Sequence, residues 1–237
     1  MKWLNRFFKV DEKPIIYCVH GFGIRRTHEY NVLKVYFENL GYTVVIPEIF
    51  DQTKTDDIDH NKWLLRVEEP LAELLSQNKR IWMIGFSMGG VIASHLASKF
   101  KVERLVLLAP AFEYITVKAI LDTVEGVARQ IIKRPEPLPK DYPPLPDNFT
   151  ITFKEIVSSC KDSIKKVDCP ILIFHGTEDE TIPIRSSDYA YASIYHRNKR
   201  LFILKDVPHR ILDEVPINQD ILKMIKDFFL NEFIKVE

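Results

Sequence analysis

Residues 80–90 read Arg-Ile-Trp-Met-Ile-Gly-Phe-Ser-Met-Gly-Gly, and this stretch decides the fold. It opens with an apolar run that predicts a buried strand, and the following residues, 88–99, predict a helix. Ser87 lies at the junction, two residues from Gly85 on one side and from Gly89 on the other. Small residues at both positions permit a sharp strand-to-helix turn that lifts the serine hydroxyl clear of the sheet. The pattern is typical of a nucleophile elbow.

The chain contains only eight glycines among 237 residues, and six of them lie in three short loops. The first loop is His20-Gly21-Phe22-Gly23, the second surrounds Ser87, and the third holds Gly176, three residues before Asp179. Glycine is favoured where the backbone needs a positive φ or a close approach to another chain segment. The three loops together are expected to form the active site of a serine hydrolase.

Strand-like and helical segments alternate along most of the chain, which predicts a largely parallel sheet with helices on both faces and hence an α/β fold. Pro70 is expected to start, kink or divide the helix in which it lies. The other expected strands span 15–19, 42–46, 104–109, 171–176 and 200–204, and the other expected helices span 30–40, 62–77, 185–195 and 218–233.

The alternation fails between residues 112 and 167. A helical patch at 117–133 is followed there by a proline-dense segment at 135–146, and such prolines cannot belong to a core strand or helix. A stretch of about 56 residues without strand rhythm is too long for a compact connection. We therefore expect a core formed by residues 1–111 and 168–237, with residues 112–167 inserted as a subdomain.

Composition limits the partners and the compartment. Lysine and arginine number 33, as do aspartate and glutamate, so the chain lacks the basic balance expected of a nucleic-acid-binding protein. The three cysteines are scattered without metal spacing, which favours a reducing compartment. The first nine residues lack a secretory apolar core, and no apolar run reaches the length of a membrane span. We expect a cytoplasmic protein without stable membrane insertion, and its oligomeric state is left open.

A serine hydroxyl needs a base to take its proton, and the base needs an acid to orient it. In the topology expected here the acid and then the histidine follow the serine in the chain, each in a loop after a strand. Asp179 and His209 meet that requirement. His209 is favoured over His28 because only His209 follows the last expected strand. The alternative acids are Glu113, Glu178 and Glu180.

The tetrahedral intermediate of acyl transfer carries an oxyanion that needs two backbone N–H donors. One is expected from Met88, directly after the nucleophile, and the other from Phe22 in the loop after the first strand. The glycines beside Phe22 allow that backbone to turn inward. No histidine and carboxylate pair shows metal-ligand spacing, so neither a metal nor another cofactor is expected.

These motifs resemble the α/β-hydrolase superfamily, most closely its small carboxylesterase and monoacylglycerol-lipase-like branch. The resemblance rests on His20-Gly21-Phe22-Gly23, on residues 85–90, on residues 175–183 and on His209, and it extends from about Pro14 to the last helix. It implies that residues 112–167 form a cap over the pocket and that Phe22 and Met88 form the oxyanion hole. One departure is the pair of residues around His209, Pro208 and Arg210, where the family often has a small residue before the histidine.

The sequence thus predicts a serine carboxylesterase that acts on small to medium-chain esters through an acyl-enzyme. An apolar substrate pocket is expected from Phe22, Met88, Phe112 and Ile182. A thioesterase, a lysophospholipase or an amidase with the same triad is an alternative. A ligand-binding protein that keeps the pocket without turnover is an alternative from a different class.

Overall fold

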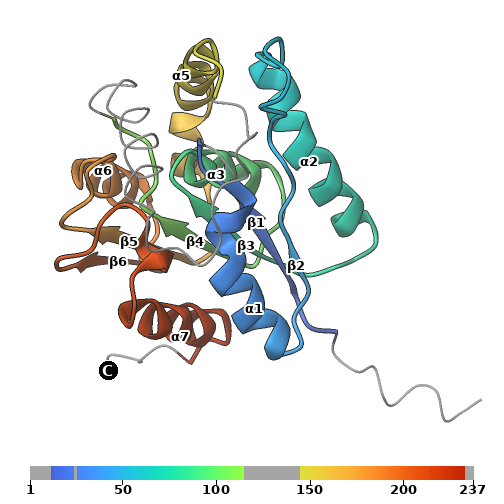
Figure 1. Cartoon of the computed structure of the whole chain (residues 1–237). Helices are drawn as coiled ribbons and strands as arrows, with labels where there is room; N and C mark the ends of the chain where they lie inside the picture. Colours follow the sequence, from blue (N-terminus) through green and yellow to red (C-terminus); the bar gives the residue numbers. More distant parts are fainter. Residues whose placement is uncertain (1–11, 24–25, 115–144, 233–237) are drawn as a thin grey trace, which may run out of the picture.

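Six parallel strands form one sheet in the order β2-β1-β3-β4-β5-β6 (Figure 1), which confirms the predicted fold class. The structure is a computed structural model that describes residues 12–23, 26–114 and 145–232. The strands are β1 (Ile15–Val19), β2 (Val44–Val45), β3 (Ile81–Phe86), β4 (Arg104–Leu108), β5 (Ile171–Gly176) and β6 (Lys199–Leu204). All of β1, β3 and β5 is buried, as expected of central parallel strands covered on both faces.

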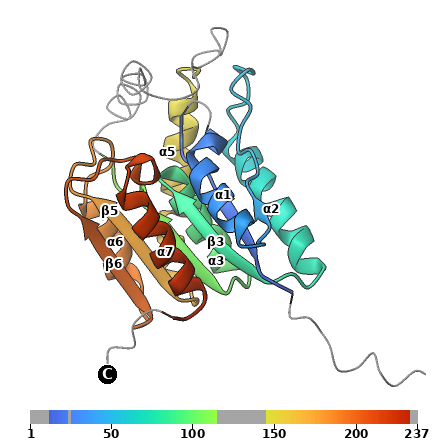
Figure 2. The ribbon, with the colours of Figure 1, turned by 60° about the horizontal axis from the view of Figure 1, so that its bottom comes forward.

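Helices cover both faces of the sheet (Figures 1 and 2). One face packs against α1 (Asn31–Asn39) and α7 (Ile217–Phe229), and the other against α2 (His60–Ser76), α3 (Met88–Lys99) and α6 (Arg185–Ser193). Alternate strand residues point to opposite faces, so Tyr17 lies in the core beneath α2 and α3 whereas Cys18 lies in the core beneath α1 and α7. Because all the strands run parallel, their carboxyl ends meet at one edge of the sheet, where ligands bind in folds of this kind.

The described part of the expected insertion packs into the main core. It contains α5 (Phe149–Cys160) and the 3-10 helix η4 (Lys161–Lys166). Phe149 and Phe153 are fully buried in the cluster that also holds Trp63 of α2, and Phe149 lies edge-on to Trp63 at 5.2 Å between ring centroids. The patch at 117–133 and most of the proline-dense segment lie outside the described residues. The boundaries of the cap remain a prediction.

The structure narrows two expectations. Pro70 lies inside one helix from His60 to Ser76, so it neither starts nor divides that helix, and the kink stays a prediction. Trp63, Val67 and Leu71 form a buried stripe along α2, and this packing offsets the backbone hydrogen bond that proline cannot make. The strand expected at 42–46 pairs with β1 only at Val44 and Val45. As an edge strand it has a neighbour on one side only.

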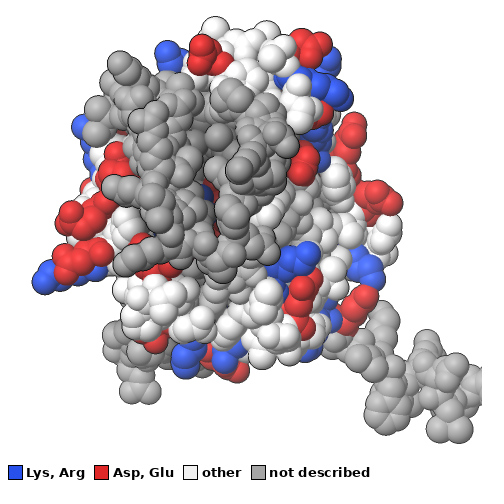
Figure 3. Space-filling model, viewed as in Figure 1, with Lys and Arg blue, Asp and Glu red and all other residues white. Residues whose placement is uncertain are grey.

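The surface carries charges of both signs. Acidic and basic side chains are interspersed over the described part of the face in Figure 3, in keeping with the equal numbers of each in the sequence. None of the helices within the described ranges is long and apolar enough to cross a membrane.

Candidate active site

Ser87 occupies the turn between β3 and α3 with φ 52° and ψ −120°, a conformation that non-glycine residues rarely adopt. Such a backbone costs about 1–3 kcal/mol and persists only where its surroundings hold it. Here the Ser87 N–H donates to the Leu108 carbonyl at 2.9 Å, and the Ala111 N–H donates to the Ser87 carbonyl at 3.0 Å. The predicted elbow is therefore present and is fastened to the end of β4.

The glycines around Ser87 are required by close approach. A Cβ on Gly89 would lie 2.0 Å from the Val19 carbonyl oxygen and 2.4 Å from the His20 carbonyl oxygen. A Cβ on Gly85 would lie 2.5 Å from the Gly89 carbonyl oxygen. Both neighbours are backbone atoms that cannot move aside cheaply. Because Gly85 and Gly89 have no side chain, the start of α3 packs directly on the end of β1.

Asp179 and His209 are joined directly, since His209 Nδ1 lies 2.7 Å from Asp179 Oδ2. Asp179 comes after β5 and His209 after β6, so both lie at the same edge of the sheet as Ser87. Asp179 Oδ1 accepts hydrogen bonds from the backbone N–H groups of Thr181 at 2.9 Å and Ile182 at 2.7 Å. The carboxylate is thus fixed by its own turn while its second oxygen faces the imidazole.

The loops that carry the acid and the base are bonded to each other. The Thr177 N–H donates to the Leu204 carbonyl at 2.8 Å, and the Glu178 N–H donates to the Val207 carbonyl at 3.0 Å. A Cβ on Gly176 would lie 1.9 Å from the Val207 carbonyl oxygen, so only glycine permits this approach. The separation of Asp179 from His209 is set by backbone contacts between adjacent strand ends.

The charge on Asp179 determines the tautomer of His209. Burial would raise the pKa of the Asp179 carboxyl, but the nearby His209, hydrogen bonds and His175 outweigh it, and the pKa lies below its ordinary value. An ionised carboxylate can only accept, so Nδ1 of His209 carries the proton. Nε2 is then the ring nitrogen with a free lone pair when the imidazole is neutral, which is the arrangement a general base requires.

His175 was not among the predicted catalytic residues, and it lies fully buried at the end of β5. Its Nε2 is 2.9 Å from the Ile182 carbonyl oxygen and 3.3 Å from Asp179 Oδ2, and its Nδ1 is 2.7 Å from Ser187 Oγ. A carbonyl only accepts, so Nε2 holds the proton and Nδ1 accepts from the Ser187 hydroxyl. Burial lowers the pKa of His175, which keeps the ring neutral. The signal available in the sequence was the His-Gly pair before Asp179.

His209 also contacts the elbow through the residue before the serine. The rings of Phe86 and His209 lie 4.8 Å apart between centroids. Ser87 itself is buried, with 5% of its surface exposed, and the hydrogen bonds among the described residues include none between its hydroxyl and His209. Hydrogen bonds of this kind are often formed only when substrate is bound.

The two predicted oxyanion donors lie beside the serine. A Cβ on Gly21 would lie 3.3 Å from the Ser87 Cβ, so the loop containing Phe22 passes directly over the elbow. The Met88 N–H belongs to the first residue of α3, where a helix leaves its amide groups without an internal acceptor. Neither N–H donates to another residue in the ranges that the structure describes. The Phe22 ring packs against Phe153 at 5.2 Å between centroids, which anchors the loop.

The alternative candidates lie elsewhere or make other contacts. Glu113 is paired with Lys161 at 3.4 Å and with Arg185 at 3.2 Å. His28 is exposed on the 3-10 helix η2 (Arg26–Tyr30). Glu180 accepts a hydrogen bond from the backbone N–H of His209 at 3.1 Å, so it contacts the base through the main chain and not through the ring.

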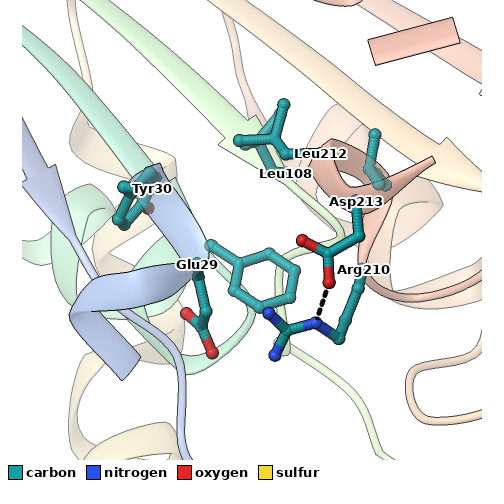
Figure 4. A pocket seen from close by; sticks show the side chains of 8 residues that line it. Glu29, Tyr30, Leu108, Arg210, Leu212 and Asp213 are labelled. Carbon is teal, nitrogen blue, oxygen red and sulfur yellow. Dashed lines mark hydrogen bonds and ion pairs between the residues drawn. The ribbon is translucent and has the colours of Figure 1, made fainter. Parts of the chain in front are cut away.

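The four side chains expected to line a substrate pocket are all buried: Phe22, Met88, Phe112 and Ile182. A pocket in the described part of the structure, lined by Glu29, Phe86 and Arg210 among others, has none of these four residues in its lining (Figure 4). The predicted substrate pocket therefore remains a prediction. The described residues contain no cluster of three or more histidine, cysteine or acidic side chains arranged to hold a metal ion.

The chain is similar to known hydrolases over most of its length. Residues 16–217 match the α/β hydrolase family. A thermostable monoacylglycerol lipase of Bacillus sp. (strain H-257) is 24% identical over 216 residues, which cover 85% of each chain.

Solved structures share the fold. A structure of the metagenome-derived lipolytic enzymes LipS and LipT superposes with a TM-score of 0.71 at 19% identity, over 91% of this chain and 93% of that one. The monoacylglycerol lipase of Paleococcus ferrophilus gives a TM-score of 0.67 at 14% identity, over 91% of this chain and 94% of that one.

Proposed function

The chain belongs to the α/β hydrolase family, and from this membership and the geometry at Ser87 we propose that it is a serine carboxylesterase. The observation that carries the proposal is the 2.7 Å contact between Asp179 and His209 at the strand edge that also holds the serine elbow. The similarity to a monoacylglycerol lipase supports an ester as the substrate. Ser87 is the nucleophile, His209 the general base and Asp179 the residue that orients it.

The proposed reaction has two halves. Ser87 Oγ attacks the ester carbonyl carbon while His209 Nε2 takes the hydroxyl proton. The tetrahedral intermediate collapses, the bond to the alcohol breaks, and the alcohol leaves with the proton from His209. Water then attacks the acyl-serine, again losing a proton to His209, and the carboxylic acid leaves as Ser87 recovers its hydrogen.

Two backbone amides stabilise the oxyanion in both halves. We assign them to Phe22 and Met88, whose N–H groups have no acceptor within the described residues. Each such donor supplies about 3–4 kcal/mol of transition-state stabilisation in serine proteases. Because Phe22 is anchored by its ring and Met88 by α3, both donors are fixed before substrate binds.

The preferred substrates are small to medium-chain esters held under a cap formed by residues 112–167. Phe112 and Ile182 lie in loops that follow strands at the edge of the sheet where Ser87 lies. Their buried apolar side chains favour a substrate with an uncharged acyl group. Thioesters, lysophospholipids and amides are the competing substrates of the same triad. A ligand-binding protein without turnover is the competing function.

The proposal is tested by hydrolysis of p-nitrophenyl acetate, butyrate and octanoate, together with 1-monobutyrin and the matched thioester and amide. Wild-type protein is expected to hydrolyse the esters and Ser87→Ala to lose the activity by about 10³-fold or more, since loss of the nucleophile in subtilisin costs about 10⁶ in kcat. Ser94→Ala is the matched control. It removes a hydroxyl from the same helix, where Ser94 Oγ donates only to the Gly90 carbonyl.

The outcomes separate the alternatives. Turnover in wild type and Ser94→Ala but not in Ser87→Ala supports the assigned nucleophile. Equal rates in wild type and Ser87→Ala contradict it. Faster cleavage of the thioester or amide than of the ester replaces the carboxylesterase assignment, and ligand binding with no turnover of any substrate favours the non-catalytic function.

A further inference from the structure

Three loops meet around the proposed catalytic groups. We call them the oxyanion loop (residues 20–23), the acid loop (177–183) and the base loop (205–210). The acid and base loops are joined by backbone hydrogen bonds between neighbouring strand ends. The oxyanion loop follows β1, which β3 and β4 separate from β5 in the sheet. Hydrogen bonds between neighbouring strand ends therefore do not fix its position relative to the base loop.

Glu29 holds the oxyanion loop from one side. Its Oε2 accepts a hydrogen bond from the Gly21 N–H at 3.0 Å, one residue before the Phe22 N–H that we assign to the oxyanion hole. The next residue, Tyr30, donates from its hydroxyl to the Val19 carbonyl at 2.9 Å. The helix η2 is thus attached to the end of β1 at two consecutive residues, and its acidic side chain turns back toward the loop.

Arg210 approaches Glu29 from the base loop. It directly follows His209 and begins the 3-10 helix η5 (Ile211–Asp213), which packs against η2. Its Nε donates to Asp213 Oδ2 at 2.5 Å, and Figure 4 shows the guanidinium turned toward Glu29 across the pocket that both residues line. Burial alone would lower the pKa of Arg210, but Glu29, Asp213 and Glu180 raise it above its usual range.

Glu180 completes the arrangement from the acid loop. Its Oε2 accepts from the His209 N–H at 3.1 Å, so this carboxylate fixes the backbone of the base. Arg210 is therefore a cation near carboxylates that bind the oxyanion loop and the base loop. The Arg210 side chain is half-buried, and a charge in that position is stabilised by opposite charges beside it.

The charges have a consequence for the reaction. A carboxylate bonded to Gly21 N–H lies next to the place where the oxyanion forms, and like charges at short range repel. A cation beside Glu29 removes that repulsion while leaving the hydrogen bond to Gly21 intact. Arg210 is suited to this task because the guanidinium stays charged and can donate to more than one carboxylate.

The structure assigns to Arg210, Glu29 and Glu180 the role of an ionic clamp that positions the oxyanion loop against the catalytic histidine and neutralises the acidic charge beside the oxyanion hole. The inference rests on the proposed serine esterase function. These three are positioning residues, since they act through Gly21 and His209 and not on the substrate.

The test compares Arg210→Met, Arg210→Lys, Glu29→Gln and the double variant Arg210→Met/Glu29→Gln. Arg80→Met is the matched control, because Arg80 pairs with Glu103 at 2.6 Å near the start of β3, at the opposite edge of the sheet from Ser87. The readouts are kcat and KM for p-nitrophenyl butyrate, the melting temperature, and the rate at which a fluorophosphonate labels Ser87.

Arg210→Met is expected to lower kcat and the labelling rate by about tenfold or more, with KM changed by less than about threefold. Arg210→Lys keeps a charge and recovers part of the loss. Glu29→Gln has a smaller effect, because its amide oxygen still accepts from Gly21. The kcat of the double variant is expected to exceed that of Arg210→Met, since the negative charge that Arg210 no longer offsets is then absent.

Equal kcat values in Arg210→Met and Arg80→Met would overturn the clamp, as would a double variant whose losses simply add. If Arg210→Met does not fold, Glu29→Gln and Arg210→Lys decide: kcat and labelling equal to wild type in both would overturn the clamp. If the wild-type protein neither hydrolyses esters nor reacts with the fluorophosphonate, the proposed esterase function is wrong. That outcome differs from active wild type with unaffected variants, which overturns the clamp alone.

Discussion

Asp179 is the residue on which the site converges. Its two carboxylate oxygens face two backbone amides and two histidines, of which His209 is the proposed base and His175 is fully buried. His175 in turn binds the Ile182 carbonyl, so it connects the strand end to the turn that holds Asp179. The acid is positioned by groups on both sides of its loop.

The buried His175 makes stability depend on pH. Its pKa is lowered in the folded protein, whereas in the unfolded chain it is about 6.5. Between these values the unfolded state binds more protons, so the free energy of unfolding falls as the pH is lowered below about 6.5. One group contributes a slope of at most about 1.4 kcal/mol per pH unit.

Urea unfolding of wild type and His175→Gln between pH 7.5 and 5 measures this contribution. The stability advantage of the wild type over the variant should shrink as the pH falls, because the variant has no imidazole to protonate. A difference that stays constant over this range would show that the ring is not held neutral by burial.

At the scale of elements, the contact between α3 and β1 sets the height of Ser87 above the sheet. Gly89→Ala places a methyl group 2.0 Å from one backbone carbonyl oxygen and 2.4 Å from the next. The expected result is a loss of about 3 kcal/mol or more in the free energy of unfolding, as for severe overpacking. Esterase activity should fall with it, because relief of the clash displaces the elbow.

Gly41→Ala is the control for this substitution. Gly41 has φ +78°, and its nearest foreign atom is the end of the flexible Lys13 side chain at 3.2 Å. It should cost about 1–2 kcal/mol through the left-handed backbone alone and leave activity intact. Urea unfolding curves of wild type, Gly89→Ala and Gly41→Ala measure these free-energy losses. Equal losses in the two variants would contradict the close-contact explanation.

The elements that the sequence predicted well are those whose signal is local. The buried apolar run of 15–19 and the helix of 88–99 have the predicted bounds, because the first ends at the His20-Gly21 turn and the second begins directly after Ser87 in the elbow motif. The helix expected at 62–77 spans His60–Ser76 with Pro70 inside it, and the tertiary packing of Trp63 and Leu71 stabilises it there. The length of β2 was not predictable in the same way, because it is set by pairing with β1 at Val44 and Val45 and not by a local signal.

At the scale of the whole molecule, Asp179 and His209 were predicted in loops after successive strands, and the structure places them in contact. The topology accounts for this proximity, because parallel strands place their following loops at one edge. The catalytic roles of Ser87, Asp179 and His209 stay predictions. The ionic clamp was not predictable in the same way. Glu29 and Arg210 are far apart in the sequence, and no sequence motif connects one with the other.

The central claim is that Ser87 forms a covalent acyl-enzyme with its neighbours in the assigned roles. The most direct measurement is mass spectrometry of peptides from protein treated with a fluorophosphonate, for wild type, His209→Ala and Ser94→Ala. The account predicts one adduct per chain on the peptide containing Ser87, formed rapidly in wild type and Ser94→Ala and slowly in His209→Ala. An adduct on another residue, or equal labelling rates with and without His209, would contradict it.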